Sequence, residues 1–166
     1  MPSAIREAYA RAIRIAISTP HRASLRLLKP VPSRVFTPAE ANSALSGVRP
    51  VVERLVAVRA RLRELEGTQR GLVHAIGGNG GGQVATELNE ARDEFTDLAG
   101  ELDDCLTRLD ALGVQVKDPD AGLLDFPAVR DGEDVLLCWR LGEDEILYWH
   151  YPADGFAGRK PIDWGE

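Results

Sequence analysis

The residues of this sequence that could do chemistry lie in its last third, where polar side chains stand among apolar ones. Seven of them are of types found in metal, acid–base or anion-binding sites: Asp125, Cys138, Arg140, Glu143, Glu145, His150 and Arg159. Thiolate, imidazole and carboxylate groups ligate metals, whereas guanidinium groups bind carboxylates and phosphates. The elements that carry these residues decide which kind of site can form.

A metal site would need Cys138 and His150 on the same side of the chain. The apolar runs 135–141 and 146–150 predict two strands joined by a four-residue turn. In that register four pairs face each other, namely Trp139–Tyr148, Cys138–Trp149, Leu137–His150 and Leu136–Tyr151. Cys138 and His150 then lie on opposite faces, and only a one-residue bulge would bring them together. We therefore predict no metal and no cofactor.

An anion site would use the arginines. Arg140 follows Trp139, and Arg159 lies on a glycine-containing loop close to further aromatic residues, so the two guanidinium groups could hold a planar or anionic small molecule. The alternative is structural: Asp125 and Arg159 form a buried pair that pins the C-terminal loop onto the hairpin. The candidate ligand-binding residues are Asp125, Trp139, Arg140, Glu143, His150 and Arg159, and no catalytic residue is assigned.

Two long helices precede these strands. Thr37-Pro38-Ala39-Glu40 is a capping box that starts a helix with apolar residues at helical spacing as far as Gly67, and Pro50 predicts a kink or a break within it. A second helix is expected over 83–112, where apolar residues recur at alternating steps of four and three: Val84, Leu88, Ala91, Phe95, Leu98, Leu102, Cys105, Leu109 and Leu112.

Charge predicts how these helices pair. Residues 83–112 carry nine acidic and two basic residues, while residues 49–70 carry six arginines and three glutamates. An acidic helix repels its own copy, so an intramolecular antiparallel hairpin is favoured, with the glycine-rich segment 77–82 as its connection.

The first 34 residues differ from the rest. They hold seven basic residues and one acid, a net charge of +6. Since the whole chain has a net charge of −6, residues 35–166 carry a net charge of −12. We predict a basic extension, partly helical or disordered, followed by one α+β domain over 35–166. The acidic body argues against duplex nucleic acid as a partner.

Composition excludes several protein classes. With 44% hydrophobic and 28% charged residues the chain is no disordered tail, and its longest apolar run is too short to span a membrane. Two cysteines and the lack of a secretory signal favour a reducing, cytoplasmic location.

The sequence also resembles an uncharacterised prokaryotic family, domain of unknown function 2203. The resemblance covers Val35 to about Asp163 and rests on Phe36-Thr37, Glu40-Ala41-Asn42, Val48-Arg49-Pro50, Gly113 to Asp118, Gly122 to Pro127, Cys138-Trp139-Arg140-Leu141-Gly142-Glu143, Trp149-His150 and Gly155 to Ile162. It implies a cytoplasmic protein that begins near Phe36, and it implies no activity.

The sequence thus predicts an α+β fold: a long antiparallel, coiled-coil-like helical hairpin over 35–112, with a small β-hairpin subdomain and loops over 113–166. Two functional hypotheses follow. The first is a non-enzymatic interaction or assembly module whose hairpin binds a protein partner or a second copy of the chain. The alternative is a small-molecule (anion) or metal-binding enzyme with its site near the β-hairpin.

Overall fold

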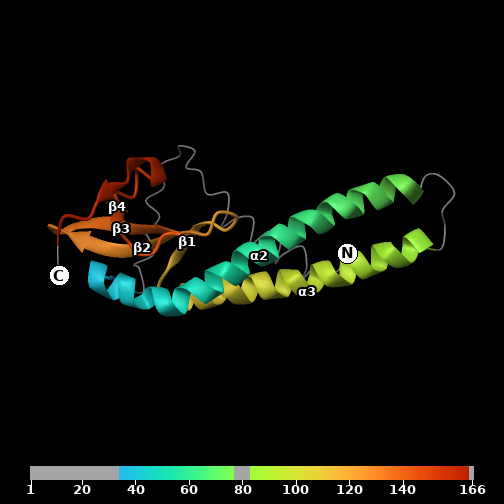
Figure 1. The fold of residues 1–166 in the computed structure, drawn as a ribbon, viewed down its shortest axis with the longest axis horizontal. Helices are drawn as coiled ribbons and strands as arrows, with labels where there is room; N and C mark the ends of the chain where they lie inside the picture. Colours follow the sequence, from blue (N-terminus) through green and yellow to red (C-terminus); the bar gives the residue numbers. More distant parts are fainter. Residues whose placement is uncertain (1–33, 77–82, 165–166) are drawn as a thin grey trace, which may run out of the picture.

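The structure is a computed structural model that describes residues 34–76 and 83–164, with side chains over 34–68 and 85–164. Two long helices form a hairpin that lies against one face of a five-stranded sheet and extends well beyond it (Figure 1). The elements are α2 (Pro38–Ile76), α3 (Gln83–Ala111), β1 (Gln115–Asp118), β2 (Leu123–Arg130), β3 (Glu133–Arg140), β4 (Tyr148–His150), the 3₁₀ helix η1 (Phe156–Gly158) and β5 (Lys160–Pro161). The α+β class and the helical hairpin are confirmed. The predicted extension over 1–34, except for Arg34, and the connection over 77–82 lie outside the described residues.

The capping box starts α2 as expected. The backbone N–H of Thr37 donates to Glu40 Oε2 at 2.9 Å, and that of Glu40 donates to Thr37 Oγ1 at 3.2 Å. The helix then continues through Pro50 without a break and past Gly67 to Ile76. Of the two alternatives predicted at Pro50, the break into two helices is therefore wrong, and only the kink is compatible with one continuous helix. Val48, Val51 and Val52 are buried on either side of the proline, and their packing keeps the segment helical.

The predicted seam of α3 packs against α2. Ala91, Leu102, Cys105 and Leu109 are buried, whereas Leu112 lies beyond the end of the helix and is 36% exposed. The helix ends at Ala111, and Gly113, two residues later, has a left-handed φ of +80°.

The charges pair across the hairpin as the antiparallel arrangement requires. Arg54 binds Glu101 through both carboxylate oxygens, and Arg61 binds Glu94 in the same way. Moving along α2 from residue 54 to 61 thus corresponds to moving back along α3 from 101 to 94. These pairs are exposed, so they specify the pairing more than they stabilise it.

The sheet is larger than the predicted β-hairpin. Its five antiparallel strands follow each other in chain order, and β2 and β3 are paired over their full length. The sequence patterns predicted strands only over 135–141 and 146–150, so this pair was missed. Asp131-Gly132, both with positive φ, forms the two-residue turn between them. An Asp-Gly pair between apolar runs is a recognised hairpin signal.

The β3–β4 register also differs from the prediction. Leu136 pairs with His150, Leu137 with Trp149 and Cys138 with Tyr148, one residue away from the expected pairing. The connection is longer than the predicted four-residue turn, because β3 ends at Arg140 and β4 begins at Tyr148. Since side chains alternate between faces, a shift of one residue moves His150 to the face that carries Cys138.

Contacts from α2 and β3 hold this connection in place. Asn42 Oδ1 accepts from the backbone N–H of Ile146 at 2.8 Å, and Arg49 donates to the carbonyl oxygens of Glu143 and Asp144 at 3.2 and 3.0 Å. Trp139 Nε1 also donates to the Glu143 carbonyl. The path of the loop is thus fixed by the helix beneath it.

The two faces of the sheet have different roles. Leu124, Phe126, Leu137 and Trp139 join the helices in one hydrophobic core. Gly122, with φ of +62°, lets the β1–β2 turn approach α2, because a Cβ there would lie 2.9 Å from Val52 Cγ1. The opposite face carries the polar residues of the candidate site.

The seam generates a stability prediction. Leu109→Ala should lower the free energy of unfolding by about 2 to 5 kcal/mol, because Leu109 is fully buried between helices and sheet. Asp103→Ala, at an exposed position of the same helix, should change it by less than about 0.5 kcal/mol. Urea unfolding of both variants measures the difference, and equal small effects would contradict the packing described.

Candidate metal centre

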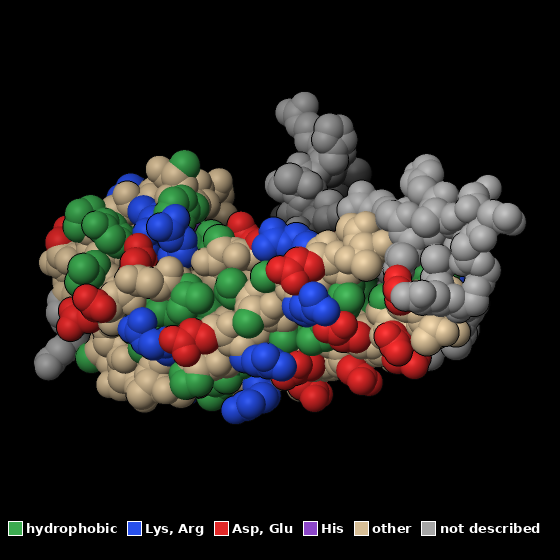
Figure 2. Space-filling model, turned by 45° about the vertical axis from the view of Figure 1, so that its right-hand side comes forward, with side chains coloured by type: hydrophobic (Ala, Val, Ile, Leu, Met, Phe, Trp, Pro, Cys, Tyr) green, Lys and Arg blue, Asp and Glu red, His purple; other side chains and the backbone are tan. Residues whose placement is uncertain are grey.

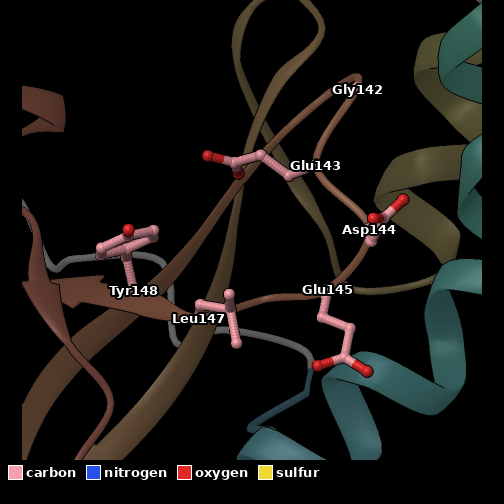
Figure 3. Close-up of a pocket in the computed structure, with 6 residues that line it drawn as sticks. All are labelled: Gly142, Glu143, Asp144, Glu145, Leu147 and Tyr148. Carbon is pink, nitrogen blue, oxygen red and sulfur yellow. The ribbon is translucent and has the colours of Figure 1, made fainter.

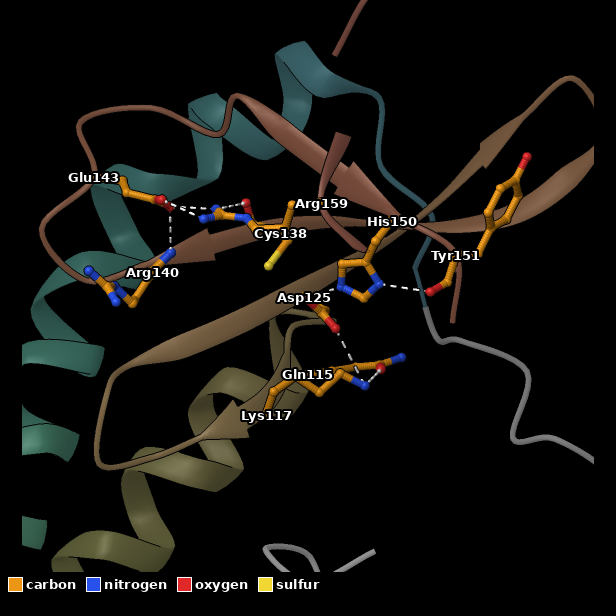
Figure 4. A network of polar contacts seen from close by, with 9 residues as sticks. All are labelled: Gln115, Lys117, Asp125, Cys138, Arg140, Glu143, His150, Tyr151 and Arg159. Carbon is orange, nitrogen blue, oxygen red and sulfur yellow. Dashed lines mark hydrogen bonds and ion pairs between the residues drawn. The ribbon is translucent and has the colours of Figure 1, made fainter. Parts of the chain in front are cut away.

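Three buried side chains from neighbouring strands converge on the polar face of the sheet. Asp125 on β2, Cys138 on β3 and His150 on β4 are at most 2% exposed. One ligand atom from each, the carboxylate oxygen, Sγ and a ring nitrogen, lies within 4.8 Å of the other two. Figure 4 shows the three groups facing one another. The register explains this directly: Asp125 pairs with Cys138, and His150 lies diagonally across from Cys138.

His150 is held at both ring nitrogens. Nδ1 lies 2.8 Å from the carbonyl oxygen of Tyr151, and because that oxygen only accepts, Nδ1 carries a hydrogen. Nε2 lies 3.2 Å from Asp125 Oδ1. Burial acts to lower the pKa of His150, but the contacts with Asp125 and the Tyr151 carbonyl outweigh it and hold the pKa above its ordinary value.

Asp125 has a second partner at the surface. Lys117 Nζ on β1 lies 3.6 Å from Asp125 Oδ2, and it donates to Gln115 Oε1 at 2.9 Å. Asp125 therefore directs one carboxylate oxygen towards His150 and the other towards Lys117.

The Cys138 thiol is protonated in this environment. Burial, with the nearby Asp125 carboxylate, raises its pKa to about 12. A nucleophilic cysteine needs a lowered pKa and solvent access, and Cys138 has neither. The arrangement is thus unsuited to a Cys–His–Asp nucleophile, whereas a bound metal ion would deprotonate the thiol.

Arg159 does not pair with Asp125, so the predicted buried pair is wrong. Its guanidinium binds both carboxylate oxygens of Glu143, at 2.7 and 2.8 Å, and donates to the carbonyl oxygen of Cys138 at 2.9 Å. The rings of Tyr148 and Phe156 lie 4.5 and 4.7 Å from it. Although burial opposes ionisation, the hydrogen bonds from Arg159 keep the pKa of Glu143 below its ordinary value. Arg159 thus ties the β4–β5 connection to β3 next to Cys138.

The structure does not bring the other candidates together as an anion site. Trp139 is fully buried on the helix-facing side of the sheet. Arg140 is exposed, and Figure 4 shows its guanidinium pointing away from Arg159. Arg140 donates to Glu143 Oε2 through its backbone N–H at 2.8 Å, so this contact does not use its guanidinium. The two arginines therefore do not share a pocket.

A shallow depression lies over the β3–β4 connection (Figure 3). Its lining residues are Gly142, Glu143, Asp144, Glu145, Leu147 and Tyr148. The three carboxylates point in different directions in Figure 3, so they form no cluster. Their negative charge makes this depression a poor site for an anion.

The comparisons with known proteins place the chain in a family. The family model described as "Uncharacterized conserved protein (DUF2203)" matches residues 34–162. The chain belongs to the DUF2203 family. No curated protein and no solved structure matches it. The matched region includes both α2 residues that hold the β3–β4 connection, Asn42 and Arg49, and all three residues of the buried cluster. Among the described residues, no helix has a stretch that is apolar and long enough to cross a membrane.

Sequence reasoning missed part of the DUF2203 cluster. Cys138 was excluded as a partner of His150 because the expected register put the two on opposite faces. Gln115 and Lys117 were not considered. Their two-residue spacing within the segment after Gly113 was a usable signal, since alternate residues of a strand share a face. Nothing in the local sequence indicates that this strand pairs with the one that carries Asp125.

The Arg159–Glu143 pair generates a prediction with a pH dependence. Arg159→Met should lower the free energy of unfolding at pH 7 by about 2 to 3 kcal/mol, because it leaves a half-buried carboxylate without its partner. The lowered pKa of Glu143 contributes stability above its unfolded value of 4.5, and this is lost as the pH falls through the folded pKa. The loss of unfolding free energy caused by Arg159→Met should therefore be smaller at acidic pH than at pH 7.

The matched control is Arg140→Met, which removes an exposed guanidinium from the neighbouring strand end. Its effect at pH 7 should stay within about 0.5 kcal/mol. Urea unfolding at several pH values measures both variants. Equal losses for the two, or a deficit that is the same at every pH, would contradict the pairing.

Proposed function

We propose that this protein binds one transition-metal ion through Asp125, Cys138 and His150, and that zinc is the preferred metal. The observation that carries the proposal is the convergence of three buried ligand groups of different types within 4.8 Å. Mixed sulfur, nitrogen and oxygen ligands suit zinc and related transition metals, whereas calcium and magnesium require oxygen ligands. This proposal replaces the expectation of no metal, which rested on the incorrect register.

The surrounding contacts support the same function. A metal-ligating histidine usually donates its other ring N–H to a carbonyl or carboxylate, and the Tyr151 carbonyl accepts from Nδ1 of His150, which leaves Nε2 as the ligand atom. Ligating carboxylates are also held by outer partners, as Lys117 holds Asp125. Metal binding would release protons from Cys138 and His150, and so would be tighter at higher pH.

The number of ligands bears on whether the centre is structural or reactive. Structural zinc sites have four protein ligands, while catalytic sites have three and take water or substrate as the fourth. Within the described residues the group has three members. We therefore propose that the metal would keep its fourth position for a small ligand and act on that ligand as a Lewis acid.

Metal content tests the proposal directly. Protein purified without an affinity tag and given zinc should retain about one ion per chain after gel filtration, measured by elemental analysis. Zinc at about 100 times its Kd should raise the free energy of unfolding by about 2.7 kcal/mol, because it binds the folded state. Cys138→Ala and His150→Gln should lose both effects.

Cys105→Ala is the matched control, because Cys105 is also a buried free cysteine but lies on α3. It should retain the metal and the stabilisation. Zinc retention by Cys138→Ala equal to that of Cys105→Ala would show that the metal binds elsewhere. No retention by the wild-type chain would overturn the proposal.

A second candidate function is the interaction module predicted from the sequence. The observation that favours it is the extension of the helical hairpin beyond the sheet, where acidic side chains gather (Figures 1 and 2). Sedimentation velocity over a wide concentration range tests its homo-oligomer form, which predicts a sedimentation coefficient that rises with concentration. A sedimentation coefficient that stays at the monomer value would exclude self-association and leave binding to a different protein as the remaining form of this function.

The cytoplasmic location and the division into 1–34 and 35–166 stay predictions.

A further inference from the structure

Lys117 gives the proposed metal centre a charged group at its surface side. Its ammonium lies 3.6 Å from Asp125 Oδ2, and its side chain is 39% exposed while that of Asp125 is 2% exposed. In Figure 4 Lys117 and Gln115 lie on the side of Asp125 away from the Glu143–Arg159 pair. Lys117 thus connects the buried cluster with solvent.

We propose that the centre takes a small oxyanion as its exogenous ligand and that Lys117 selects it. This inference rests on the proposed metal binding. A carboxylate or a small tetrahedral oxyanion would place one oxygen on the metal and accept a hydrogen bond from the ammonium with another. Lys117 is then a positioning residue for the ligand and is itself no metal ligand.

The balance of charge favours an anion over a neutral or cationic ligand. The Asp125 carboxylate and the Cys138 thiolate together cancel the charge of a divalent metal ion, so Lys117 leaves the centre with one net positive charge. Arg159 adds none, because Glu143 neutralises it. Arg140 is directed away from the cluster. A charge-assisted hydrogen bond in a poorly solvated site is stronger than the same bond in water.

Burial restricts the size of the ligand. Asp125, Cys138 and His150 are at most 2% exposed, so their surroundings are packed. A bulky substrate cannot reach the three groups in this packing, whereas a small anion can approach from the side of Lys117, whose side chain is 39% exposed. The substrate class is therefore a small carboxylate or another small oxyanion.

The experiment uses cobalt(II) as a spectroscopic substitute for zinc in the full chain. Its visible absorption and its thiolate charge-transfer band report binding at Cys138 before any anion is added. Acetate and sulfate are then titrated separately, with chloride at matched ionic strength as the control. The visible bands should shift saturably with either oxyanion and stay unchanged with chloride, and the stronger of the two identifies planar carboxylate or tetrahedral oxyanion chemistry.

Variants of Lys117 separate the two proposals. Lys117→Met should retain cobalt but bind the oxyanion about tenfold more weakly, since it loses the charge-assisted hydrogen bond. Lys117→Arg should restore most of the affinity, and Lys160→Met, which removes a lysine that lies over Trp149, should match the wild type. Cobalt binding with bands insensitive to oxyanions, or an equal shift in Lys117→Met, overturns this inference alone. No cobalt–thiolate band in the wild type overturns both.

Discussion

The contacts between α2 and the β3–β4 connection are the constraint on which the candidate site depends. Asn42 and Arg49 hold the backbone of residues 143–146 through side-chain hydrogen bonds. They fix how many residues the connection uses before β4 begins, and so they set the β3–β4 register. That register puts His150 on the face of Cys138. A pairing one residue away would turn His150 towards the helices and separate it from Asp125 and Cys138, the other two candidate ligands.

The sheet separates two kinds of packing that would interfere with each other. One face packs against the helices with apolar side chains such as Leu124, Phe126 and Leu137, and this packing supplies most of the stability of the fold. The other face buries a carboxylate, a thiol and an imidazole. The imidazole and the carboxylate are tolerated there because their polar atoms have partners. Nδ1 of His150 donates to the Tyr151 carbonyl, and the Asp125 oxygens contact His150 and Lys117. Burying such polar groups costs stability, and proteins break the apolar-core rule mainly at functional sites, which is consistent with a metal centre.

The sequence predicted the elements whose signals are local. The capping box at Thr37 and Glu40, the seam of α3 and the opposite charges of the two helices act within one element or between adjacent ones, and each appears in the structure. The β3–β4 register could not be predicted, because it depends on Asn42 and Arg49, about 100 residues earlier in the chain. The prediction of Asp125 as the partner of Arg159 failed for the same reason. Glu143 reaches Arg159 only because the path of that connection is fixed.

The most direct measurement of the central claim is the X-ray absorption spectrum of the zinc-loaded protein, since it counts sulfur ligands without reference to activity. The account predicts one sulfur per zinc at about 2.3 Å, from Cys138, with the remaining ligands nitrogen and oxygen at about 2.0 to 2.2 Å. The sulfur shell should disappear in Cys138→Ala and persist in Cys105→Ala. A spectrum with oxygen and nitrogen alone, or with two sulfurs per zinc, would contradict the site formed by Asp125, Cys138 and His150.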